Sequence, residues 1–136
     1  MKGDKLYVLD SWAILAYFNG ESAAEKVADV IADAKESDIP LLMSVINLGE
    51  VWYIIARRLS YKDADEAVAI LEQFGVKFVD ADIANARGAA TFKAKGKISY
   101  ADCYAAALAE ERGASLITGD REFAQFKDRI KILWMT

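Results

Sequence analysis

Four acidic residues occupy positions where a carboxylate is either costly or well placed for chemistry. The run "YVLD" ends in Asp10 and the run "LITGD" ends in Asp120, so each of these acids follows a short apolar segment. Asp102 lies in "SYAD", three residues after Ser99. Glu50 lies among large apolar residues in a segment with helical periodicity, where a charge is unfavourable unless something pairs with it.

Each acid also has an ordinary structural interpretation. Asp10 and Asp120 are typical N-caps of the segments that follow them, and Asp102 has the spacing of a capping box with Ser99. The charge of Glu50 can be paired by an arginine seven residues further along the same helix, at position 57. Taken singly, Asp10, Asp102 and Asp120 require no function, whereas Glu50 is better explained by a cleft wall where it meets the other acids.

The four acids gain a chemical meaning if they converge in space. Carboxylates brought together repel one another, and some take up protons unless cations bind. With one or two divalent cations they form an oxygen cage, which can hold a phosphodiester and activate a water molecule. The hydroxyl groups of Ser11 and Thr118 lie beside Asp10 and Asp120 in the sequence, where they can hold a carboxylate ligand in orientation.

The residue types that are missing restrict this chemistry. The chain has no histidine, which excludes Ser-His-Asp and Cys-His catalysis and histidine zinc sites. Its one cysteine, Cys103, excludes an internal disulfide and a thiolate cage, and its alanine-rich surroundings indicate a small buried residue. A metal site in this chain would therefore use oxygen ligands, which favours Mg²⁺ or Mn²⁺.

Length and charge restrict the class of protein. A chain of 136 residues with 54% hydrophobic residues is expected to form a single domain over residues 1–136. The net charge of −4 argues against binding nucleic acid through overall charge, so an anionic substrate would need bound cations or a local basic patch. No apolar run approaches the ~20 residues of a membrane span, and no signal-peptide pattern is present. We expect a cytoplasmic protein without membrane contact.

The periodicity of apolar residues predicts strands that alternate with helices. Predicted strands cover residues 5–9, 41–43, 76–79, 115–118 and 130–133, and predicted helices cover 11–18, 22–35, 45–59, 62–74, 82–95, 99–112 and 121–126. This alternation indicates an α/β fold with a parallel sheet and helices on both faces. Ligand sites in such sheets lie beyond the carboxyl ends of the strands, where Asp10 and Asp120 are expected to be neighbours.

With these residues identified, the sequence resembles a PIN domain of the VapC toxin type. The resemblance lies in three stretches, "VLDSWAILAYF", "INLGEVWYIIARR" and "ISYADCYAAALAEERGASLITGDREF", which follow one another in the family's order over nearly the whole chain. Trp12 is bulkier than the small residue that often follows the Asp-Ser pair in this family, and it is expected to narrow the cleft.

The resemblance implies a fold, an activity and partners. The fold would be a three-layer α/β/α sandwich with a central, mostly parallel sheet of about five strands. The activity would be hydrolysis of RNA phosphodiester bonds by an endoribonuclease that depends on Mg²⁺ or Mn²⁺. Such proteins are usually toxins of type II toxin–antitoxin pairs, restrained by a small antitoxin protein, and commonly homodimers. The family's acidic quartet and supporting hydroxyls correspond to Asp10, Glu50, Asp102, Asp120, Ser11 and Thr118.

Several alternatives remain open at this point. Glu50 either completes the cage or orients the attacking water. The wide apolar arc of the helix over residues 45–59 is either all core or partly a dimer or antitoxin interface. The same fold could also serve as a non-catalytic RNA- or protein-binding module. A receiver-like signalling domain is a further alternative, although it requires adjacent acids after the first strand, where this chain has Asp10 followed by Ser11.

Overall fold

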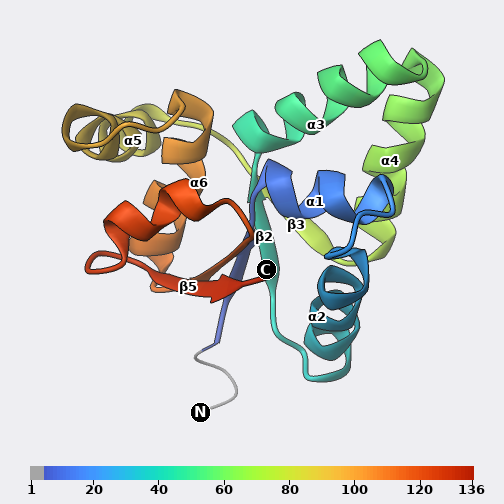
Figure 1. The fold of residues 1–136 in the computed structure, drawn as a ribbon, viewed down its shortest axis with the longest axis horizontal. Coiled ribbons are helices and arrows are strands. Elements are labelled where there is room, and N and C mark those ends of the chain that lie inside the picture. Colours follow the sequence, from blue (N-terminus) through green and yellow to red (C-terminus); the bar gives the residue numbers. More distant parts are fainter. Residues whose placement is uncertain (1–4) are drawn as a thin grey trace.

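A five-stranded parallel sheet forms the centre of the molecule in a computed structural model, which describes residues 5–136 (Figure 1). The strands are β1 (Tyr7–Leu9), β2 (Leu41–Ser44), β3 (Val76–Val79), β4 (Ser115–Thr118) and β5 (Lys131–Trp134). They lie in the order β3-β2-β1-β4-β5, and every neighbouring pair is parallel. The expected domain span of residues 1–136 includes residues 1–4, which lie outside the described residues.

Helices cover both faces of this sheet. They are α1 (Ser11–Phe18), α2 (Ala24–Glu36), α3 (Val45–Arg58), α4 (Tyr61–Gln73), α5 (Ile83–Lys95), α6 (Tyr100–Arg112) and the short 3₁₀ helix η2 (Arg121–Phe126). Helices α1 to α4 share one core with the sheet, and α5, α6 and η2 share the other (Figure 1). The predicted three-layer architecture is confirmed.

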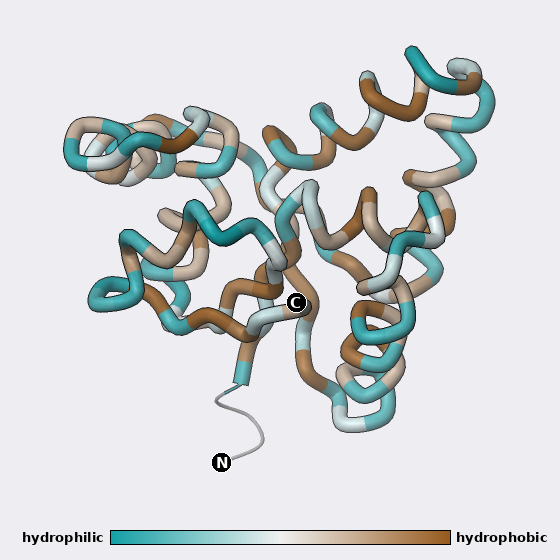
Figure 2. The backbone as a smooth tube through the Cα atoms, viewed as in Figure 1, coloured by the Kyte–Doolittle hydropathy of each residue, from teal (hydrophilic) through white to brown (hydrophobic). Residues whose placement is uncertain are grey.

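The three central strands, β1, β2 and β4, have apolar middles because successive residues point into different cores. On one face the sheet contributes Leu9, Met43 and Ile117, and on the other face it contributes Val8, Leu42 and Leu116. Two buried faces remove the alternation of polar and apolar residues that a half-exposed sheet would show. In Figure 2 the central strands are accordingly hydrophobic, whereas the turns between helices are mainly hydrophilic.

The predicted elements are all present, with small differences at their ends. The first strand begins at Tyr7 instead of residue 5, and the last strand covers Lys131–Trp134, one residue later than predicted. The second helix begins at Ala24, two residues later than predicted. Among residues 5–136, no helix combines the length and the apolar character that crossing a bilayer requires.

Candidate metal centre

The carboxyl ends of β1 and β4 bring Asp10 and Thr118 into direct contact. These two strands are neighbours, with Leu9 opposite Ile117, so the residues that follow them emerge side by side. The Thr118 hydroxyl donates a short hydrogen bond to Oδ2 of Asp10, across 108 positions of sequence. The parallel pairing of β1 with β4 therefore brings together residues that are far apart in the sequence.

Asp10 is completely buried and both of its oxygens are hydrogen-bonded. Oδ1 accepts the backbone N–H of Ala13 at 2.9 Å, so Asp10 is the N-cap of α1. The pKa of Asp10 is raised to about 7, mainly by burial and to a lesser extent by the nearby charges of Asp102 and Asp120, against the lowering effect of the hydrogen bonds from Thr118 and Ala13. These two donors are neutral groups, so they do not cancel the negative charge of the Asp10 carboxylate.

Thr118 connects Asp10 to a second acid. While its hydroxyl donates to Asp10, its oxygen accepts the backbone N–H of Asp120 at 3.1 Å. Asp120 in turn caps η2, with Oδ1 accepting the backbone N–H of Glu122 at 2.9 Å. One buried hydroxyl thus orients the side chain of Asp10 and the backbone of Asp120 together.

Glu50 reaches the same edge from α3. Ser11, in the first turn of α1, donates its hydroxyl to Oε1 of Glu50 at 2.7 Å. The hydroxyl that neighbours Asp10 in the sequence therefore contacts Glu50 in space. The alternative pairing of Glu50 with Arg57 is wrong, because the Arg57 guanidinium lies over the ring of Tyr53, 4.9 Å from its centroid.

Asp102 lies in the first turn of α6. Its backbone N–H donates to the hydroxyl of Ser99, the N-cap, at 3.2 Å, so the serine half of the predicted capping box is present. Burial raises the pKa of Asp102 to about 6. The hydrogen bond with Ser99 lowers this pKa, and the charges of Glu50, Asp120 and Glu122 raise it.

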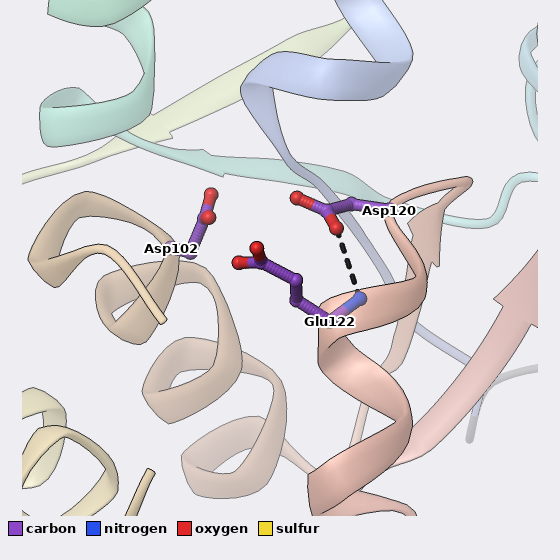
Figure 3. A group of neighbouring side chains, drawn as sticks. All are labelled: Asp102, Asp120 and Glu122. Atoms are coloured by element: carbon purple, nitrogen blue, oxygen red, sulfur yellow. Dashed lines mark hydrogen bonds between the residues drawn. The ribbon is translucent and has the colours of Figure 1, made fainter. Parts of the chain in front are cut away.

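Three carboxylates meet between α6 and η2. Asp102, Asp120 and Glu122 each place an oxygen within 4.8 Å of the other two, and Figure 3 shows the side chains pointing toward one another. Glu122 was not singled out from the sequence, where it stands in "GDREF" as an ordinary acid in the first turn of a short helix. The only signal in the sequence was that Glu122 follows Asp120 by two residues.

Asp10 and Glu50 flank this group and are coupled to it by charge. Asp10 interacts with Asp102 and Asp120, and Glu50 interacts with Asp102. Among residues 5–136, no lysine or arginine forms an ion pair with any of these carboxylates. The structure therefore gathers acids at one edge of the sheet and leaves their charge uncompensated by protein cations.

The donor set fits a hard divalent cation. All the candidate ligands are carboxylate oxygens, without nitrogen or sulfur, and oxygen donors of this kind suit Mg²⁺ or Mn²⁺. Asp102, Asp120 and Glu122 are close enough to share one ion, and the buried Asp10 is near enough for the charges of Asp102 and Asp120 to raise its pKa. The arrangement could hold a cation while leaving positions open toward solvent, because Asp102 and Asp120 are only half-buried and Glu122 is exposed.

Trp12 forms part of the rim beside these acids. Its indole ring packs against Gly119, between Thr118 and Asp120, so closely that a Cβ atom added to Gly119 would lie 2.1 Å from the ring. A Cβ atom fits at this contact only if the indole or the backbone shifts. The indole therefore contacts the backbone that joins two of the site residues, Thr118 and Asp120.

Cavity volume alone would point to a different part of the molecule. Two cavities, of about 280 and 320 Å³, lie at the amino ends of the strands, the first lined by residues including Pro40 and Lys77 and the second by Lys5 and Lys131. Neither is lined by any of the acids described above. The convergence of carboxylates, and not cavity size, identifies the candidate site.

Comparison with known proteins places the fold among well-described structures. Residues 7–129 match the PIN domain family. A chain in the crystal structure of VapBC2 from Rickettsia felis, bound to a DNA fragment from the promoter, is 13% identical with a TM-score of 0.72, covering 94% of this chain and 97% of that chain. No curated protein matches the sequence.

Two further structures show a similar likeness. A chain of VapBC-1 from nontypeable Haemophilus influenzae is 20% identical with a TM-score of 0.71, covering 96% of this chain and 98% of that chain. VapC20 from Mycobacterium tuberculosis, a toxin that cleaves the sarcin-ricin loop, is 21% identical with a TM-score of 0.67, covering 88% of this chain and 93% of that chain. At these identities the likeness establishes the fold.

Proposed function

The chain belongs to the PIN domain family, and from that premise we propose that it is a VapC-type endoribonuclease that hydrolyses RNA phosphodiester bonds with Mg²⁺ or Mn²⁺. The observation that carries the proposal is the group of Asp102, Asp120 and Glu122 within 4.8 Å, backed by the buried Asp10 and without a protein cation among the described residues. The family match also argues against the receiver-like signalling domain.

The residues of the site have distinct parts in this proposal. Asp10, Asp102 and Asp120 hold the cation directly or through water, and Glu50 completes the carboxylate set or orients the attacking water. Glu122 is a fifth acid within reach of the same ion. Ser11 and Thr118 do not touch the cation, but their hydroxyls fix the orientation of Glu50 and Asp10.

The cation and the protein supply complementary parts of the chemistry. A bound divalent ion neutralises the acids, lowers the pKa of water and stabilises charge on the phosphodiester oxygens. The protein supplies carboxylates held in place before the ion arrives. Asp10 and Asp102, whose pKa values are raised to about 7 and about 6, would hold the ion as deprotonated carboxylates, so metal affinity would rise with pH across this range. An acidic pocket can in this way accept an acidic substrate.

We propose an antitoxin protein and a second copy of the chain as partners, and a cytoplasmic location where RNA is available. Support comes from the similar structures, among them a toxin–antitoxin complex from Klebsiella pneumoniae. Support also comes from the surface of α3 and α4. Val51 and Ile55 are buried in the core, whereas Tyr53, Leu59 and Tyr61 are 42%, 71% and 73% exposed. The apolar arc of α3 is thus divided between core and surface.

The proposal is tested by RNA cleavage with and without metal. Purified protein is incubated with structured and unstructured RNA in EDTA, Mg²⁺ or Mn²⁺, and the products are resolved on a gel. The wild type is compared with Asp102→Asn and with Asp29→Asn, a matched change of an exposed acid on α2. We expect metal-dependent cleavage by the wild type and by Asp29→Asn only.

Two outcomes would count against the proposal. Cleavage that persists in EDTA, or in Asp102→Asn, would show that the acids are not the source of activity. RNA binding without cleavage in any metal would favour the non-catalytic module on the same fold.

A further inference from the structure

Asn47 is a buried polar residue that the site described so far does not use. The buried polar side chains among residues 5–136 are Asp10, Ser11, Ser44, Asn47 and Thr118. Three of these belong to the acidic site, and Ser44 caps α3. Asn47, in the first turn of α3, has no exposed surface and needs a separate explanation.

The amide of Asn47 ties α3 to the first turn of α6. Its Nδ2 donates to the backbone oxygen of Ala101 at 3.0 Å, across 54 positions of sequence. Ala101 lies inside α6, where its carbonyl is already the acceptor for the N–H four residues further on. The bond from Asn47 is therefore additional, and the carbonyl of Ala101 does not need it to be satisfied.

Stability does not account for an amide at this position. Oδ1 of Asn47 is buried and has no hydrogen-bond partner among the described residues. A buried acceptor without a partner is unfavourable, whereas replacing the group by an apolar side chain of similar shape removes that cost. A leucine would lose the bond to Ala101 together with this cost, so the exchange is close to neutral and stability gives little reason for asparagine here.

The hydrogen bond between Asn47 and Ala101 lies close to two acids of the site. Asn47 precedes Glu50 by three residues on α3, so the two lie on the same side of the helix, and Ala101 immediately precedes Asp102. Helices α3 and α6 otherwise belong largely to different cores, on opposite faces of the sheet. Glu50 and Asp102 repel each other, so nothing in their own charges holds these two backbones together.

We propose that Asn47 is a positioning residue of the acidic site, whose amide fixes the first turn of α6 against α3 and so sets the separation of Asp102 from Glu50. The inference rests on the proposed function, since the separation matters only if the two carboxylates serve one site. Its consequence is that Mn²⁺ affinity depends on Asn47 although its side chain is not one of the clustered ligands.

The test separates metal affinity from stability. Wild type, Asn47→Leu, Asn47→Ala and Ile55→Ala are compared by thermal unfolding in EDTA and by calorimetric titration with Mn²⁺ alone. Ile55 is a buried apolar residue on the same helix, two turns further on, and serves as the control for a general loss of packing. Asn47→Ala keeps the test valid if the leucine is not accommodated.

We expect Asn47→Leu to keep a midpoint close to that of the wild type in EDTA and to bind Mn²⁺ about 10- to 100-fold more weakly. Ile55→Ala is expected to show the reverse, with a lower midpoint and wild-type Mn²⁺ affinity. Wild-type affinity in both Asn47 variants would overturn this inference alone. Absence of Mn²⁺ binding by the wild type would overturn the proposed function and this inference with it.

Discussion

Helix α6 carries an acid near each end, and the two are treated in opposite ways. Glu110, in the last turn, accepts hydrogen bonds from Nε and Nη2 of Arg129 at 2.9 and 2.8 Å, and this pairing lowers the pKa of Glu110. Asp102, in the first turn, has no such partner, and its pKa is raised to about 6 by burial. The same helix thus has one acid compensated by the protein and one left for an external cation.

The hydrogen-bond donors differ between the two ends of α6. Arg129 also donates to Thr91 at 3.2 Å and lies 3.6 Å from the centroid of the Phe92 ring, so it clamps α5 and α6 to the segment before β5. At the acidic site, the hydrogen-bond donors are neutral hydroxyl and N–H groups. Neutral donors orient a carboxylate without cancelling its charge, which is the condition that a cation site requires.

The largest effect is expected from Asp10→Asn, which keeps the shape of the side chain and removes its charge. We expect RNA cleavage in Mn²⁺ to fall by on the order of 10³-fold or more, because a ligand of the proposed cation is lost. The amide oxygen can still accept the N–H of Ala13, so circular dichroism should show an intact fold. Cleavage at the wild-type rate in this variant would contradict the assignment of Asp10.

The next effect is expected from Gly119→Ala. The added Cβ would lie 2.1 Å from the Trp12 ring, so the ring or the backbone between Thr118 and Asp120 must move. We expect a loss of about 1–3 kcal/mol in the free energy of unfolding, measured with urea, and a loss of cleavage. The control is Gly49→Ala on α3, where nothing lies within 4 Å and a gain of about 0.5–1 kcal/mol is expected. Equal stability of the two variants would contradict the contact.

A smaller effect is expected from pH in the metal-free protein. The folded-state pKa of Asp10, about 7, is above the value of about 4 for an unfolded aspartate, so the native state holds a proton that the unfolded state releases. The contribution of this proton to the free energy of unfolding is fully present below about pH 4 and is lost as the pH rises through about 7. Asparagine does not ionise, so the stability of the Asp10→Asn variant does not change with pH for this reason.

The measurement is urea unfolding of both proteins in EDTA across this range. We expect Asp10→Asn to become more stable than the wild type as pH rises, by on the order of 1–4 kcal/mol near pH 8. Saturating Mn²⁺ should remove or reverse the difference, since the ion stabilises only the wild type. A difference that does not change with pH would show that Asp10 is not protonated in the metal-free protein.

The smallest effect is expected at the compensated end of α6. Arg129→Ala loses the pair with Glu110, the bond to Thr91 and the contact with Phe92. Because both charged side chains are partly exposed, we expect a loss of only about 1 kcal/mol in unfolding free energy. Mn²⁺ affinity, measured by calorimetry, should be unchanged. A weaker affinity would mean that the two ends of α6 are not independent.

Sequence patterns were sufficient for the fold and for the edge of the sheet where the acids lie. Two apolar runs that end in Asp10 and Asp120 predicted buried parallel strands with the acids at their carboxyl ends, and the structure pairs these two strands directly. The elements were predicted nearly residue by residue, since the breaks at Gly75, Gly96 and Gly113 separate them clearly.

Contacts between distant helices could not be predicted in the same way. Ser11 was expected to orient a carboxylate, but the sequence did not indicate that this carboxylate is Glu50, on α3. Glu122 joins Asp102 only through the geometry of the short helix η2. Asn47 resembles an ordinary polar residue of a helix, and its meaning depends on a carbonyl 54 positions away. Such pairings depend on how helices pack, which the periodicity of one helix does not encode.

The most direct test of the acidic site is a crystal of the protein grown with Mn²⁺ and measured at the manganese absorption edge. We expect an anomalous peak among Asp10, Asp102 and Asp120, in contact with the carboxylate oxygens of at least two of them. The peak should be absent in crystals of Asp102→Asn grown in the same way. Manganese found only elsewhere on the surface, with these carboxylates unoccupied at saturating Mn²⁺, would contradict the account.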